Sequence, residues 1–238
     1  MKIALIGYGK MGKIIESIAL SRGHEISFRI DIDNQSDLNS LDPSNTDVAI
    51  EFSHPTAAFG NIKACLENHV KVISGTTAWL DRKPEIEKIC RDTNGTFLHA
   101  SNFSIGVNIF FRINEIMATI MNDHPGYAVD ITEIHHTEKK DAPSGTAITL
   151  AERILPHLKT KDGWIGGDAG DNSKIPVASI REGKVPGTHI TRYKSNDDEI
   201  VLKHEAYSRE GFATGAVAVA EWIKDKAGVL EMKDFLSI

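Results

Sequence analysis

The feature that most constrains the fold is a regular alternation of short apolar segments with helix-like segments over the first hundred residues. The predicted strands are residues 3–6, 25–31, 47–52, 70–74 and 96–99, and the predicted helices between them are residues 11–22, 55–68 and 82–93. Strands that alternate with helices of ten or more residues favour a parallel sheet covered on both faces. We therefore expect an α/β fold for this part of the chain.

The pattern changes beyond residue 104. Isoleucines at helical spacing predict a long helix over residues 106–121. Further elements follow more closely: strands at 127–136, 177–181, 189–193 and 200–206, a helix at 146–157, a polar hairpin turn at 194–198 and a glycine-rich loop from Gly163 to Gly170. These strands predict a second α+β domain of about residues 105–210 with a mixed or antiparallel sheet. A helix over 213–224 is expected to return to the first sheet.

A glycine turn follows the first predicted strand and opens the first predicted helix. Its sequence is Gly7-Tyr8-Gly9-Lys10-Met11-Gly12, which matches G-x-G-x-x-G. The three glycines allow a tight turn, backbone approach to a pyrophosphate and close helix packing, and the helix N-terminus attracts the phosphates. Asp31 ends the second strand, where its carboxylate can accept hydrogen bonds from ribose hydroxyls. Together these features predict a Rossmann-like dinucleotide site.

The residues around this turn bear on which cofactor is bound. Asp31 favours the unphosphorylated ribose of NADH, and Ile32 follows it where an arginine would pair with a 2′-phosphate. Lys10 and Lys13 add positive charge near the turn. We expect NADH as the first choice, and use of both NADH and NADPH stays open.

Charge and cysteine content exclude some classes of function. The chain has 238 residues, a net charge of −6 and two cysteines without a CxxC pair. An acidic chain argues against nucleic acid as the partner, and two isolated cysteines support neither a disulfide framework nor a zinc cluster. The longest apolar stretches are too short to span a membrane or to act as a signal peptide. We expect a cytoplasmic protein with no membrane partner.

The segment from Glu133 to Ala147 combines paired histidines, a charged loop and a helix start. Its sequence is EIHHTEKKDAPSGTA, in which Ser144 is the expected helix N-cap. Adjacent strand residues point to opposite faces, so His135 and His136 cannot easily share one ion and no metal site is expected. A solvated charged turn explains the lysines equally well from this segment alone. The upstream dinucleotide site favours a proton-transfer role, because a reductase needs a proton donor.

This segment resembles the E-x-H-H-x-x-K-x-D-A-P-S-G-T-A signature of the bacterial 4-hydroxy-tetrahydrodipicolinate (dihydrodipicolinate) reductase family of lysine and diaminopimelate biosynthesis. The similarity continues in segments 75–77, 101–104 and 212–216, so it spans essentially the whole chain. It implies a nucleotide domain of residues 1–104 completed by 211–238, and a domain of residues 105–210 that binds substrate and forms homotetramers. The activity it implies is the NAD(P)H-dependent reduction of a small cyclic imine dicarboxylate.

The resemblance also implies roles for individual residues. His135 and Lys139 match the catalytic pair, with His135 as the proton donor. The implied cofactor-binding positions are Gly7, Tyr8, Gly9, Lys10, Met11, Gly12, Asp31, Gly75, Thr76, Thr77, Ser101, Asn102, Phe103 and Ser104, and the implied substrate-binding positions are His136, Lys139, Ser144, Gly145 and Thr146. Two other functions compete: a dehydrogenase of another amino or semialdehyde acid, and a non-catalytic NADH-sensing regulator. Neither accounts for the pairing of His135 with Lys139.

Overall fold

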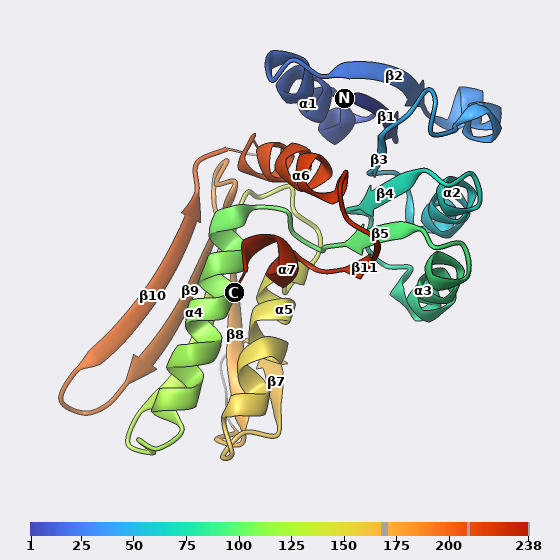
Figure 1. The fold of residues 1–238 in the computed structure, drawn as a ribbon. Coiled ribbons are helices and arrows are strands. Elements are labelled where there is room, and N and C mark those ends of the chain that lie inside the picture. The colour runs from blue at the N-terminus through green and yellow to red at the C-terminus, as the bar shows by residue number, and fades with distance from the viewer. Residues whose placement is uncertain (168–170, 209, 238) are drawn as a thin grey trace. The chain divides into compact units, whose positions relative to one another are not determined.

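The computed structural model describes residues 1–167, 171–208 and 210–237. The chain divides into two compact units (Figure 1): unit 1 comprises Met1–Ile105 with Glu210–Ile238, and unit 2 comprises Gly106–Arg209. The fold-class prediction is confirmed, since unit 1 holds a parallel sheet and unit 2 a mixed one. None of the helices formed by the described residues has the length and apolar character needed to cross a membrane.

Unit 1 is built on a six-stranded parallel sheet in the order β11-β5-β4-β3-β1-β2. The strands are β1 (Lys2–Ile6), β2 (Glu25–Ile30), β3 (Val48–Glu51), β4 (Lys71–Ser74), β5 (Thr96–His99) and β11 (Gly228–Leu230). The apolar side chains of the four inner strands are almost fully buried because helices cover both faces of the sheet, whereas those of the edge strands β2 and β11 are mostly half-buried. Strand β11, which the C-terminal segment adds to this sheet, was not predicted from the sequence.

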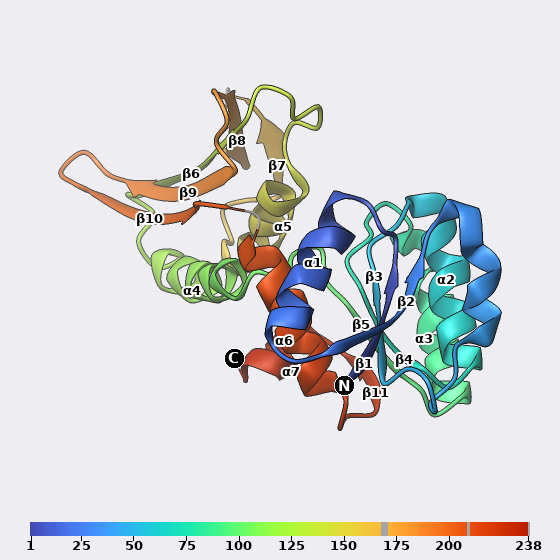
Figure 2. The same cartoon turned by 90° about the horizontal axis from the view of Figure 1, so that it is seen from above.

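Two helical layers cover this sheet (Figure 2). One core joins the sheet to α1 (Lys10–Ser21) and α6 (Glu210–Ile223), so the predicted return of the C-terminal helix to the first sheet is confirmed. The other core joins it to α2 (Pro55–Glu67) and α3 (Lys83–Asp92). The remaining helical segments are short: η1 (Ile32–Ser40), η2 (Leu80–Arg82) and α7 (Met232–Leu236).

Unit 2 contains a five-stranded sheet in the order β10-β9-β6-β8-β7. Its strands are β6 (Ala128–His135), β7 (Gly163–Gly166), β8 (Lys174–Arg181), β9 (Gly187–Lys194) and β10 (Glu199–Ala206). The helices α4 (Ile105–Met121) and α5 (Gly145–Ile154, continued by η3 at Leu155–His157) pack on the same face (Figure 2). β6 is central, with β8 parallel on one side and β9 antiparallel on the other.

Two expectations for unit 2 need correction. Gly163–Gly166 forms the edge strand β7 and is not a loop, because its backbone pairs with β8 despite its glycines. Gly170, the last glycine of the predicted loop, lies outside the described residues. β8 also begins three residues earlier than predicted, at Lys174, and includes Pro176.

Candidate active site

The segments predicted to bind a dinucleotide lie at one edge of the unit 1 sheet. Gly7 follows β1, Asp31 follows β2, Gly75–Thr77 follow β4, and Ser101–Ser104 come two residues after β5. The carboxyl ends of parallel strands share an edge, so the fold brings these segments together. β1 lies between β2 and β3, where the strand order reverses, and open α/β sheets bind their ligands at such a reversal.

The three glycines of the turn have different surroundings. A Cβ at Gly7 would lie 2.1 Å from the carbonyl oxygen of Phe52, and one at Gly12 would lie 2.4 Å from the carbonyl oxygen of Gly7. The fold itself therefore requires glycine at both positions. A Cβ at Gly9 would meet no described atom within 4 Å. Gly9 instead leaves open space at the start of α1, where a pyrophosphate would approach the backbone.

An open cavity of about 250 Å³ lies beside this turn. Asp31 lines it, and the exposed carboxylate also caps η1 by accepting a hydrogen bond from the backbone N–H of Ile32 at 2.9 Å. Several residues that were not predicted line it too, among them Gln35, Phe52, Ser53, His54 and Asn61. Ser53 and His54 could have been predicted from the sequence as residues of this edge, because they directly follow the third predicted strand.

Other predicted cofactor positions hold side chains that serve the protein interior. The hydroxyl of Thr76 donates to the buried carboxylate of Glu51 at 2.9 Å. Phe103 is fully buried, with its ring 5.7 Å from that of Phe52. Asn102 is buried and accepts a hydrogen bond from the backbone N–H of Ser104. The side chains of these three residues therefore stabilise the loops at this edge of the sheet.

The remaining predicted positions lie just before α1 and in its first turn. The Tyr8 hydroxyl donates to Glu16, whose carboxylate also pairs with Arg29. The ammonium of Lys13 lies 5.8 Å from the centre of the Tyr8 ring. Lys10 and Met11 form the start of the helix. Positive charge is therefore present near the turn, as the sequence indicated.

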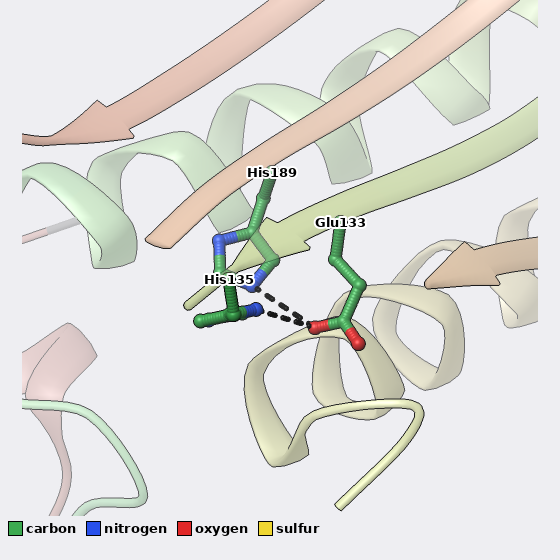
Figure 3. Close-up of side chains that lie close together, drawn as sticks. All are labelled: Glu133, His135 and His189. Carbon is green, nitrogen blue, oxygen red and sulfur yellow. Dashed lines mark ion pairs between the residues drawn. The ribbon is translucent and has the colours of Figure 1, made fainter. Parts of the chain in front are cut away.

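In unit 2, strand register assembles a buried cluster around Glu133 (Figure 3). Glu133 and His135 lie two residues apart on β6 and face the same side, while His189 pairs with Glu133 from β9. The Oε2 atom of Glu133 lies 3.0 Å from Nδ1 of His135 and 3.9 Å from Nε2 of His189. The two imidazole rings meet edge to face, with centres 5.1 Å apart.

The ionisation of this cluster follows from its partners. Burial by itself raises the pKa of the Glu133 carboxyl, but the close contact with His135 and the hydrogen bonds from Ser144 and Arg181 outweigh burial and hold that pKa far below its usual range. Burial, followed by repulsion from His135, lowers the pKa of His189 to about 3. Near neutral pH the cluster therefore contains a carboxylate and a neutral His189.

A charged loop and a helix start complete the cluster. The ammonium of Lys139 lies 2.9 Å from both carboxylate oxygens of Asp141. Ser144 caps α5 as predicted, since its hydroxyl accepts a hydrogen bond from the backbone N–H of Ala147 at 3.2 Å. Gly145 and Thr146 form the first turn of the helix. A cation and a helix N-terminus are thus close in the chain, an arrangement suited to a carboxylate ligand.

The cluster also has the donor set of a metal site. One ligand atom each from Glu133, His135 and His189 lie within 4.8 Å of one another, whereas His136 lies outside this group. The Arg181 guanidinium, 3.0 Å from Oε1 of Glu133, already neutralises the carboxylate, so a divalent cation would add uncompensated charge. The expectation that no metal is bound stays a prediction.

Sequence reasoning missed His189 and Arg181 as members of this site. His189 lies 54 residues beyond His135 in the sequence, and only the pairing of β9 with β6 brings them together. Arg181 is opposite His135 in the parallel pairing of β8 with β6. Nothing in the local sequence indicates either register.

Comparisons with known proteins identify the family. The family models "Dihydrodipicolinate reductase, N-terminus" and "Dihydrodipicolinate reductase, C-terminus" match residues 1–103 and 106–236. The chain belongs to the dihydrodipicolinate reductase family. This confirms the resemblance seen in the sequence. As a member, the chain is an oxidoreductase that uses a nicotinamide cofactor.

Similar proteins agree along the whole chain. The 4-hydroxy-tetrahydrodipicolinate reductase of Christiangramia forsetii is 49% identical, covering 100% of this chain and 98% of its own length. That of Neisseria meningitidis serogroup A is 30% identical with the same coverage. A dipicolinate-bound dihydrodipicolinate reductase from Paenisporosarcina sp. TG-14 has a TM-score of 0.78 at 20% identity, covering 97% of both chains, which shows a shared fold.

Proposed function

We propose that the chain reduces 4-hydroxy-tetrahydrodipicolinate to tetrahydrodipicolinate with NADH or NADPH, a step of lysine and diaminopimelate biosynthesis. The observation that carries this proposal is the grouping of His135, paired with a buried carboxylate, with the Lys139 loop and the N-terminus of α5. The grouping offers a proton donor and an anion-binding surface, which a cyclic imine dicarboxylate needs together. The activity of the named relatives supports the same conclusion.

The reduction needs a hydride and a proton. A bound nicotinamide cofactor supplies the hydride, which adds to a carbon of the unsaturated ring. The electron-rich enamine that results then takes a proton, and His135 is the group we assign to donate it. Lys139, together with the backbone of Gly145 and Thr146, holds a substrate carboxylate and so orients the ring. Ser144 and His136 are the further proposed substrate contacts.

Lys139 must change partners in this scheme. Its ammonium is paired with Asp141 on both carboxylate oxygens, and the Lys139 side chain is 21% exposed. A substrate carboxylate would compete with Asp141 for the same cation. Asp141 therefore keeps the ammonium localised at the site when no substrate is bound.

The cofactor proposal assigns the glycine turn to the pyrophosphate and Asp31 to the adenosine ribose. Residues of the 250 Å³ cavity fit this use, because Gly7, Gly9 and Asp31 all line it. Asp31 and the neighbouring Ile32 favour NADH over NADPH. Asp31→Ala is expected to raise the KM for NADH more than that for NADPH. Equal losses for the two cofactors in steady-state assays would remove Asp31 from the ribose.

The decisive test is an enzymatic assay. Pyruvate and aspartate semialdehyde are first condensed enzymatically. The purified chain is then added without delay, and oxidation of NADH or NADPH is monitored as the loss of nicotinamide absorbance. We expect turnover with at least one cofactor and none without the condensation product. Absence of turnover with both cofactors would contradict the proposal. Turnover of aspartate semialdehyde alone would favour a different dehydrogenase.

A further inference from the structure

Glu133 contacts groups from four separate parts of unit 2. Its Oε1 atom accepts hydrogen bonds from the backbone N–H of Ser144 and from Nη2 of Arg181, both at 3.0 Å. Its Oε2 atom faces the rings of His135 and His189 (Figure 3). The side chain is 0% exposed. A buried carboxylate is costly unless it is paired, so these contacts are what allows Glu133 to remain ionised here.

The contact with Glu133 orients the ring of His135. Nδ1 faces the carboxylate, so Nε2 points the other way, where a Cβ at Gly187 would lie 3.0 Å from it. A carboxylate on one ring nitrogen fixes the tautomer and the orientation of the ring. Among the described residues, the His189 ring on β9, which is neutral, lies edge to face with the His135 ring, and the Arg181 guanidinium on β8 contacts the other oxygen of the Glu133 carboxylate.

Arg181 extends the influence of Glu133 to the Lys139 loop. Its Nη2 atom donates to both Glu133 and the carbonyl oxygen of Asp141, the latter at 2.5 Å, and its Nε donates to the carbonyl oxygen of Lys139 at 3.3 Å. The loop backbone is thus tied to β6 through one guanidinium. The Ser144 N–H ties the start of α5 to the same carboxylate.

We propose that Glu133 is a positioning residue for the reduction, whose single carboxylate sets the ring of His135, the Lys139 loop and the start of α5 in one arrangement. It acts through these groups and does not itself contact substrate. The inference rests on the proposed function of His135 and Lys139. It goes beyond that function by assigning their geometry and the tautomer of His135 to Glu133, with Arg181 as the link to the Lys139 loop.

Glu133→Gln tests this with little change in shape. The amide removes the negative charge beside His135 and leaves one acceptor oxygen in place of two. We expect kcat to fall about 100-fold or more, because His135 and the Lys139 loop lose their common anchor. The KM for the nicotinamide cofactor should stay unchanged.

Two matched variants separate positioning from folding. Asp130→Asn makes the same carboxylate-to-amide change three residues away on the opposite face of β6, and it should leave kcat and the tautomer of His135 unchanged. Glu133→Asp keeps the charge but shortens the side chain, so we expect it to restore part of the kcat that Glu133→Gln loses. If Glu133→Gln fails to fold, Glu133→Asp replaces it in the comparison with the wild type. A wild-type kcat in folded Glu133→Gln, or an equal kcat in the Gln and Asp variants, would overturn the proposal.

Imidazole ¹⁵N spectra of the cofactor-free protein give a readout that does not depend on turnover. In the wild type we expect the His135 proton on Nδ1 when the ring is neutral, and in Glu133→Gln a mixture of tautomers. Unchanged spectra would overturn the role of Glu133. A wild type that shows this tautomer but reduces no substrate would instead contradict the proposed function and leave the geometry in place.

Discussion

At the scale of single residues, two buried histidines make unit 1 and unit 2 sensitive to acid. Burial lowers the pKa of His99 to about 4, partly opposed by a hydrogen bond to the Thr76 carbonyl, and burial with repulsion from His135 lowers that of His189 to about 3. Both rings are therefore neutral in the folded protein over a range of pH in which the same histidines of the unfolded chain are protonated, because their pKa is near 6.5 there.

Stability should consequently fall as pH falls from about 6.5 to about 4.5. In this window the unfolded state binds more protons than the folded state, so the free energy of unfolding decreases by roughly 1.4 kcal/mol per pH unit for each histidine. The lowered pKa of Glu133 acts only at lower pH, where its protonation destabilises the fold further. Urea unfolding followed by tryptophan fluorescence measures the slope, and Trp79 packs against His99. A His99→Gln variant with an unchanged slope would contradict the assignment for His99.

The roles of His135 and Lys139 lead to a second prediction at this scale. His135→Ala and Lys139→Ala should each lower kcat/KM for the imine substrate by about 100-fold or more. Binding of NADH, measured by calorimetry, should stay within a factor of a few, because neither residue belongs to the dinucleotide edge. If Lys139→Ala weakened only NADH binding, our assignment of Lys139 would be wrong. Lys140→Ala is the matched control, since Lys140 is exposed and adjacent.

At the scale of elements, two glycines of the glycine turn meet different requirements: the fold requires Gly12, and the proposed ligand requires Gly9. Gly12 is held against the backbone of Gly7 by the packing of α1 on β1, whereas Gly9 faces open space. The two glycines belong to one motif, yet only the contacts of the folded chain distinguish them.

Gly12→Ala should therefore lower stability, and Gly9→Ala should lower the affinity for the dinucleotide. An alanine at position 12 must displace a backbone oxygen at 2.4 Å, and we expect a loss of roughly 3 kcal/mol or more in the free energy of unfolding. An alanine at position 9 should cost less than about 1 kcal/mol but weaken dinucleotide binding. Thermal unfolding and NADH titration of both variants give the comparison. A stable Gly12→Ala, or a Gly9→Ala with normal NADH affinity, would contradict this reading of the turn.

In helix α4, the spacing of apolar residues predicts the helix but not its buried face. Isoleucine spacing correctly predicted a helix, but Ile109, Ile113, Ile116 and Ile120 are 42–55% exposed. The buried face instead carries Val107, Phe110, Phe111, Ala118 and Met121. Apolar residues run around most of this helix, so spacing indicates the helix without indicating which side faces the sheet.

At the scale of the whole molecule, the unit 2 sheet has an apolar face that bears on assembly. The helices α4 and α5 cover the face that carries Val129 and Ile131. Ile134 lies on the opposite face and pairs in register with Ile180, which is 43% exposed. No described helix of unit 2 packs on that face. A second copy of the chain would remove these side chains from water, in keeping with the homotetramer that the family resemblance implies.

Light scattering after gel filtration tests the assembly. We expect the wild type to have four times the 26.1 kDa mass of the chain. Ile180→Asp should shift the mass downward, because it places a charge in an apolar contact. Ile120→Asp, on the exposed side of α4, is the comparison and should leave the mass unchanged. If only Ile120→Asp dissociates the assembly, the interface lies on α4 and our choice of the sheet face is wrong.

Local sequence was sufficient for the first five strands of unit 1 and its four long helices, for the glycine turn, for the N-cap at Ser144 and for the family. Each of these depends on residues that are close in the chain, whose turn, capping and packing requirements are local. The partners of Glu133 depended on the tertiary structure, because strand register places His189 and Arg181 beside a residue about fifty positions away. The same holds for the exposed side of α4 and for strand β7. Burial and strand pairing are properties of the assembled sheet. They bring the histidine–lysine motif together with Glu133, Arg181 and His189 in one site.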